Sequence, residues 1–130
     1  ELVMFETESH TGSPIYHTDV LMYVGTTAIG LCYEVIKPEY RDLVKERVER
    51  FHDVIEIKKE QLLNFCGNCL EIPDKDGNLL LAMSTAAFNA YTELQKEKIK
   101  KHFKKIVHRD ISTIEKYGGG SARCMLAELF

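Results

Sequence analysis

The chain has 130 residues, enough for one domain with a buried core, and its 45% hydrophobic and 28% charged residues are ordinary globular proportions. A formal net charge of −3 gives no electrostatic reason to expect nucleic acid or an anionic membrane as a partner. No apolar run approaches the roughly 18 to 20 residues that cross a bilayer. Four cysteines that follow no recognisable secretory signal lead us to expect reduced thiols in a cytoplasmic protein.

The first part of the chain predicts a β-β-α-β unit. Residues 15–24 and 27–36 are rich in β-forming side chains and predict two strands. Pro38 suits the first turn of a helix, which ends at His52-Asp53 and carries apolar residues at helical spacing, namely Tyr40, Leu43, Val44, Val48 and Phe51. Residues 54–57 predict a short strand.

A looser second copy of the same unit follows. After one or two helical turns over 59–65, a hairpin of residues 68–72 and 79–83 flanks an Asp-Gly turn. Beyond it we expect a short helix capped by Ser84, and then a helix from the capping box Thr92–Gln95 to about residue 103. A strand at 106–107 follows. A second capping box at Ser112–Glu115 opens a short helical turn that Gly118 stops, and the chain closes with a strand at 124–130. Two such units indicate an α/β fold built of modules.

The first candidate for chemistry is the segment Gly118-Gly-Gly-Ser-Ala-Arg-Cys124. Three glycines let the backbone approach another group closely, and they lead into a cysteine. A thiol at the mouth of a glycine-rich loop is a candidate nucleophile. The alternative is a flexible turn before a buried structural cysteine, because free cysteine is among the most buried residue types.

The second candidate is His17-Thr18-Asp19, within the first expected strand. Residues two apart in a strand project from the same face, so the imidazole and the carboxylate would lie together. A carboxylate beside a histidine can orient it and favour a proton donor near neutral pH. The alternative is a pair of polar residues on a solvated strand face.

Taken together, these two motifs resemble the arginine deiminase, dimethylarginine hydrolase and amidinotransferase superfamily over essentially the whole chain. The segments that carry the resemblance are Pro14 to Met22, Phe65 to Glu71 and Ile114 to Phe130. They look closest to the bacterial citrulline-utilisation hydrolases that are often labelled amidinotransferases. That branch would carry Asn at position 19, so Asp19 leans toward the deiminases and the glycine-type amidinotransferases.

The resemblance implies the roles of four residues. Cys124 matches the nucleophile, and His17 matches the general acid/base. Asp19 matches a carboxylate that contacts the guanidinium or orients the histidine, and Asn68 lines the substrate site. The thiolate would attack the planar carbon of a guanidino or ureido group, and His17 would protonate the departing nitrogen. Water resolves the covalent intermediate in a hydrolase and an amine resolves it in a transferase; no cofactor or metal is implied.

The superfamily fold is a five-bladed α/β propeller of β-β-α-β modules, the pentein fold, and about two modules are present. Since the chain starts abruptly without Met, we expect residues 1–130 to be the C-terminal part of a single catalytic domain, with the N-terminal half as partner. The isolated fragment should be inactive, and a homo-oligomer is possible. An amidinotransferase and a non-catalytic binding protein of the same fold remain alternatives.

Two other features have simpler readings. Cys66-Gly-Asn-Cys69 is a C-x-x-C, but zinc normally needs a second ligand pair at characteristic spacing. A redox C-x-x-C would open a helix after a strand, whereas this one precedes a strand. The basic run at 96–105 suits a solvated helix face better than a nucleic-acid site, since aromatic residues are not interleaved.

Overall fold

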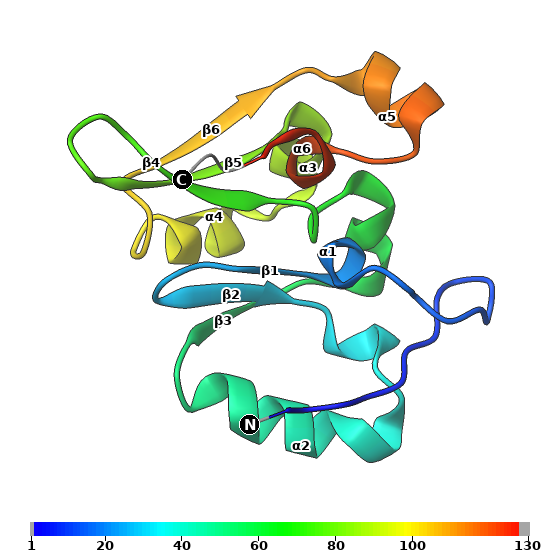
Figure 1. Ribbon diagram of the computed structural model, residues 1–130. Helices are drawn as coiled ribbons and strands as arrows, with labels where there is room; N and C mark the ends of the chain where they lie inside the picture. Colours follow the sequence, from blue (N-terminus) through cyan, green and yellow to red (C-terminus); the bar gives the residue numbers. More distant parts are fainter. Residues whose placement is uncertain (1, 128–130) are drawn as a thin grey trace.

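The computed structural model describes residues 2–127, in which two three-stranded sheets stack one above the other (Figure 1). Helix α2 (Pro38–Glu49) covers the outer side of the first sheet, and α4 (Glu93–Ile99) lies beside strand β3 (Asp53–Glu56), which it contacts. Among the helices of residues 2–127, none has the length and apolar character that a membrane crossing requires.

The first sheet pairs β1 (Met22–Val24) with β2 (Ala28–Leu31) in antiparallel register, and β2 with β3 in parallel register. All four residues of β2 are buried, because this central strand is covered on both faces. The parallel return to β3 needs a crossover, which the short 3₁₀ helix η1 (Tyr33–Val35) and α2 provide. The first predicted β-β-α-β order is therefore confirmed.

The second sheet repeats this order with β4 (Leu70–Pro73), β5 (Leu79–Ser84) and β6 (Lys105–Arg109). The first two strands form the predicted antiparallel hairpin, and β6 runs parallel to β5. The other elements that follow the first sheet are η2 (Lys59–Asn64), α3 (Thr85–Ala90), α5 (Ser112–Gly118) and α6 (Ala122–Met125). The predicted caps of α3 and α4 are confirmed, since Ser84 accepts from Ala87 N and Thr92 forms a capping box with Gln95.

One hydrophobic core runs through both units, and polar contacts fasten them together. The Glu71 carboxylate accepts hydrogen bonds from Thr26 N at 2.9 Å and Thr26 Oγ1 at 2.6 Å. His102 lies with Nδ1 3.0 Å from Thr27 Oγ1 and Nε2 3.1 Å from Asp53 Oδ2. Each of these contacts joins the two units.

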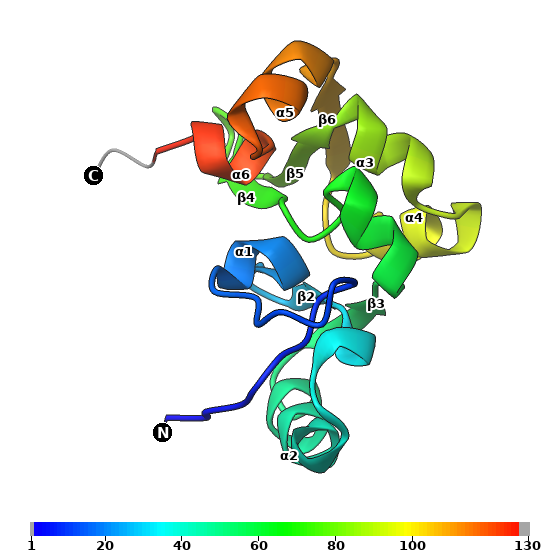
Figure 2. The same cartoon turned by 90° about the vertical axis from the view of Figure 1, so that its right-hand side faces the viewer.

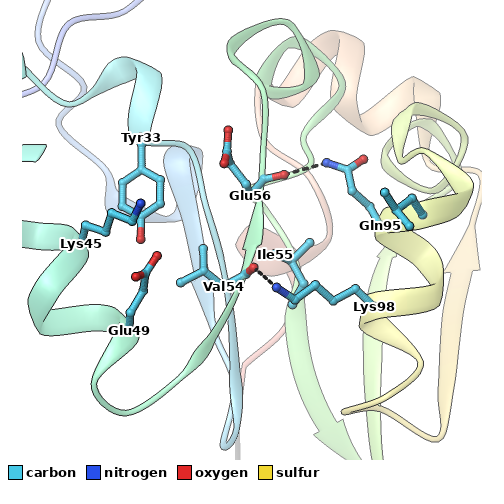
Figure 3. A pocket seen from close by; sticks show the side chains of 9 residues that line it. Tyr33, Lys45, Glu49, Val54, Ile55, Glu56, Gln95 and Lys98 are labelled. Atoms are coloured by element: carbon cyan, nitrogen blue, oxygen red, sulfur yellow. Dashed lines mark hydrogen bonds between the residues drawn. The ribbon is translucent and has the colours of Figure 1, made fainter. Parts of the chain in front are cut away.

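A hollow of about 360 Å³ lies between α2, β3 and α4 (Figure 3). On its α4 side, Lys98 donates to the carbonyl of Val54 at 2.8 Å and Gln95 donates to the carbonyl of Glu56 at 2.7 Å. Burial, with help from the nearby carboxylates of Glu49 and Glu56, raises the pKa of Tyr33 to about 12. The Lys98 and Gln95 side chains thus attach α4 to the backbone of the first sheet.

The expected strand at 15–24 is wrong over most of its length. Thr18–Leu21 forms the short helix α1, and only Met22–Val24 forms a strand. His17 is therefore the residue before a helical turn, and it does not share a strand face with Asp19. The reason is tertiary. The carbonyl of Asp19 accepts a hydrogen bond from the Asn68 side chain, and the carbonyl of Val20 packs closely against Gly67. These contacts outweigh the local β preference.

Four smaller expectations are also corrected. The strand at 27–36 ends at Leu31, and α4 ends at Ile99, where Lys100 is the C-cap. The capping box at Ser112 does not form, because Ile111 is the N-cap and Asp110 Oδ1 accepts from Ser112 N instead. Residues 122–125 form helix α6, so the expected strand from 124 is wrong there, and its end at 128–130 lies outside the described residues.

Candidate active site

The site is assembled where α1 of the first unit meets the loop between η2 and β4. Both views place α6 directly above α1 at this point (Figures 1 and 2). Gly67 makes the approach possible, because a Cβ added to it would lie 2.2 Å from the carbonyl oxygen of Val20. Only glycine allows the two backbones to come this close, and the next residue, Asn68, then reaches α1.

Asn68 forms hydrogen bonds with two of the other three predicted site residues. Its Nδ2 lies 3.1 Å from Asp19 Oδ2, 3.2 Å from the carbonyl oxygen of Asp19 and 3.1 Å from Cys124 Sγ. Its Oδ1 accepts from the backbone nitrogens of Arg123 at 3.0 Å and Cys124 at 3.4 Å. Cys124 Sγ in turn lies 3.2 Å from Asp19 Oδ2. The three side chains thus form a closed hydrogen-bonded triangle.

Cys124 is exposed on the short helix α6, which follows the glycine-rich loop after α5. Gly119 has a positive φ of 71° and ends α5, and the buried hydroxyl of Ser121 donates to Glu115 Oε1 at 2.7 Å. A Cβ on Gly120 would lie 3.0 Å from both Cβ and Sγ of Cys124. The glycine-rich loop therefore packs directly against the thiol.

His17 occupies a different position from the other three. It is exposed, it precedes α1, and within residues 2–127 its imidazole makes no hydrogen bond to the triangle. Its backbone carbonyl accepts from Val20 N at 3.1 Å and closes the first turn of α1. The structure thus brings together Cys124, Asp19 and Asn68, and leaves the His17 side chain in solvent.

A polar pocket of about 430 Å³ borders the triangle between β1 and β4. Thr18, Asp19, Glu71 and Arg123 are among the residues that line it, and the Glu71 carboxylate is held by Thr26. Two of the lining residues are acidic and one is basic, so the charge around the pocket favours a cationic ligand. Glu71 and Arg123 were not among the residues that the sequence motifs singled out.

Cys124 differs from the three other cysteines, which are buried. Burial raises the pKa of the Cys66 thiol to about 12, and it also raises the pKa values of Cys32 and Cys69. Such thiols remain protonated and unreactive near neutral pH. Within the part of the chain described here, no three His, Cys, Asp or Glu side chains converge on a position that could hold a metal ion. Cys66 and Cys69 therefore behave as core side chains.

Comparison with solved structures shows the same fold in an arginine dihydrolase from cyanobacteria, ArgZ. Its apo form gives a TM-score of 0.62 at 16% identity over 85% of this chain and 15% of that chain. Its N-terminal domain bound to product gives a TM-score of 0.64 at 18% identity over 85% of this chain and 36% of that one. The present chain thus spans well under half of these solved chains.

No curated protein matches the chain. A family model, however, matches it from residue 1 to residue 130, and its description is N,N dimethylarginine dimethylhydrolase, eukaryotic. This match confirms the resemblance to guanidine-modifying proteins at the level of the superfamily, while the closer likeness to citrulline-utilisation hydrolases stays a prediction. The chain belongs to the eukaryotic N,N dimethylarginine dimethylhydrolase family.

Proposed function

We propose that this chain supplies the nucleophile and part of the substrate pocket of a hydrolase that cleaves guanidino C–N bonds in arginine-like substrates. The observation that carries the proposal is the contact of an exposed thiol, Cys124, with the Asp19 carboxylate at 3.2 Å, beside a pocket that two acidic residues, Asp19 and Glu71, help to line. Because the Asp19 carboxylate lies so close to Cys124, a guanidinium bound to that carboxylate would have its carbon near the sulfur. Planar acceptors suit a delocalised cation well.

The proposed reaction has two halves. The Cys124 thiolate forms a bond to the guanidinium carbon, a C–N electron pair moves onto the leaving nitrogen, and a proton from His17 completes the departing amine. Water then adds to the carbon of the covalent thiouronium and gives up one proton to His17. Collapse of this adduct breaks the C–S bond, releases a second proton to solvent and leaves a ureido product and the Cys124 thiolate. Solved forms of ArgZ carry substrate, product and a covalently bound reaction intermediate, which supports a covalent route in a protein of this fold.

His17 is proposed as the acid because it lies two residues before the carboxylate that meets the thiol. Its imidazole is exposed and has no hydrogen bond within residues 2–127 that would have to break before it met a substrate. Histidine is also the side chain whose unperturbed pKa suits proton transfer near neutral pH. Further groups that hold the substrate would come from the rest of a longer protein, since the chain covers 36% or less of the solved chains.

The test compares wild-type protein with Cys124→Ala and with the matched control Cys32→Ala, which removes a buried thiol elsewhere in the core. Each protein, in its full natural length, is incubated with arginine, methylated arginines and citrulline, and the amine and ureido products are measured. We expect product from wild type and from Cys32→Ala and none from Cys124→Ala. Equal turnover by Cys124→Ala would refute the proposal. Product that appears only when an amine acceptor is added would identify an amidinotransferase instead.

A further inference from the structure

Asn68 is an almost completely buried amide, only 4% exposed, at the centre of the site. Its Oδ1 accepts from two consecutive backbone nitrogens, those of Arg123 and Cys124. Its backbone carbonyl also accepts from Arg123 N at 3.3 Å. Asn68 therefore holds the segment that carries the thiol from both its side chain and its main chain.

The amide nitrogen of Asn68 lies between the Asp19 carboxylate and the Cys124 sulfur. It is 3.1 Å from Asp19 Oδ2 and 3.1 Å from Cys124 Sγ, which are themselves 3.2 Å apart. With the Asp19 carbonyl also within 3.2 Å, the two N–H hydrogens already have three acceptors in the chain. This amide has no donor left over for a substrate, which differs from the substrate-lining role that the sequence resemblance implied.

We propose that Asn68 is the positioning residue of the nucleophile, and that its N–H group stabilises the Cys124 thiolate beside the Asp19 carboxylate. The inference rests on the proposed function, in which Cys124 is the nucleophile. A donor hydrogen-bonded to the charged form of a group favours that form, whereas a like charge at 3.2 Å opposes it. The Asn68 N–H group contacts both anions and so offsets part of their repulsion.

The experiment follows alkylation of Cys124 by iodoacetamide as a function of pH, with the modified residue identified by mass spectrometry. The other three cysteines are buried, so the native protein reports on Cys124 selectively. The variants are Asn68→Ala, which removes the donor, and Asn68→Asp, which keeps an acceptor for the two backbone nitrogens but puts a second carboxylate against Asp19. The matched control is Asn89→Asp, the same change at an exposed position of α3.

We expect the midpoint of the alkylation profile to rise by about one to two pH units in Asn68→Ala, and to rise further in Asn68→Asp. Turnover at saturating substrate should fall in both, and Asn89→Asp should match wild type. If Asn68→Ala does not fold, the test rests on Asn68→Asp alone, because its carboxylate can still accept hydrogen bonds from the backbone nitrogens of Arg123 and Cys124.

An unchanged midpoint in the Asn68 variants would overturn the proposal. So would a rise in KM with kcat and the midpoint unchanged, because that pattern belongs to a residue that contacts substrate. Alkylation of Cys124 can be measured without turnover, so the experiment tests the role of Asn68 independently of the proposed function. A shifted midpoint together with wild-type protein that converts no guanidino or ureido compound would refute the proposed function and leave the positioning role intact.

Discussion

Replacing Gly67 by alanine should disturb stability and site geometry together. The added Cβ would lie 2.2 Å from the Val20 oxygen, 2.8 Å from the Val20 carbon and 3.0 Å from the Leu21 carbonyl carbon. All three are backbone atoms, so no side-chain rotation can relieve the overlap, and α1 must move by roughly 1 Å. Overpacking of this kind costs about 1 to 3 kcal/mol. A movement of that size also takes the 3.1 Å contact between Asn68 and Asp19 beyond hydrogen-bond range.

The assays for Gly67→Ala are thermal unfolding and Cys124-dependent turnover. We expect Tm to fall by about 5 to 10 °C, and turnover to fall by about 100-fold, since a displacement near 1 Å can cost that much. The matched control is Gly118→Ala at the end of α5, where an added Cβ would meet only Ile114 Cγ2 at an ordinary 3.7 Å. If both variants unfolded at the wild-type temperature with wild-type turnover, the close approach would not be what positions the site.

Three further predictions follow from contacts in the site and the core. Gly120→Ala should slow Cys124 alkylation by about tenfold with little change in Tm, because its Cβ would lie 3.0 Å from the sulfur and displace it by a few tenths of an ångström. The free energy of unfolding should fall as pH rises from about 9 toward 12, because the Cys66 thiol loses its proton in the unfolded chain while burial keeps it protonated in the folded protein. Cys66 should contribute up to about 1.4 kcal/mol per pH unit to this fall. Glu71→Ala should destabilise the protein by about 1 kcal/mol, because Thr26 loses its acceptor.

Each of these predictions has its own check. For Gly120, equal alkylation rates would contradict the packing of the loop against the sulfur. For the alkaline loss of stability, urea unfolding at several pH values should give a shallower slope in Cys66→Ala; an identical slope would assign the effect to other groups. For Glu71, the matched control is Glu97→Ala, an exposed position of α4, and equal Tm values for the two variants would show that the contact with Thr26 contributes nothing.

Elements with local signals could be predicted from the sequence. The Asp-Gly hairpin, the helix opened by Pro38 and the capping box at Thr92 depend on residues a few positions apart, and all three form. The capping box at Ser112 has the same pattern but does not form, because the Asp110 carboxylate takes Ser112 N and the Glu115 carboxylate receives the hydroxyl of Ser121. A motif competes with its neighbours in space, which spacing alone does not reveal.

The site was predictable only in part for the same reason. Resemblance to a family picked out Cys124, Asp19 and Asn68, which do lie together. His17 and Asp19 do not share a strand face as predicted, because residues 18–21 are helical. The close approach of Gly67, nearly fifty positions along the chain, to the Val20 carbonyl determines that helical turn. No local sequence pattern near His17 predicts it.

The location of the triangle links its chemistry to the docking of the two units. Asp19 belongs to the first unit, and Asn68 and Cys124 belong to the second, so the 3.2 Å separation of carboxylate and sulfur depends on how the units are held together. The contacts that fix the docking, such as those of Glu71 with Thr26, join β4 to the turn between β1 and β2, whereas α2 covers the outer side of the first sheet. Loosening them should therefore change the reactivity of the thiol before the domain unfolds, whereas substitutions on the outer face of α2 should lower stability without that change. The two effects differ because only the first alters the position of Asp19 relative to the sulfur.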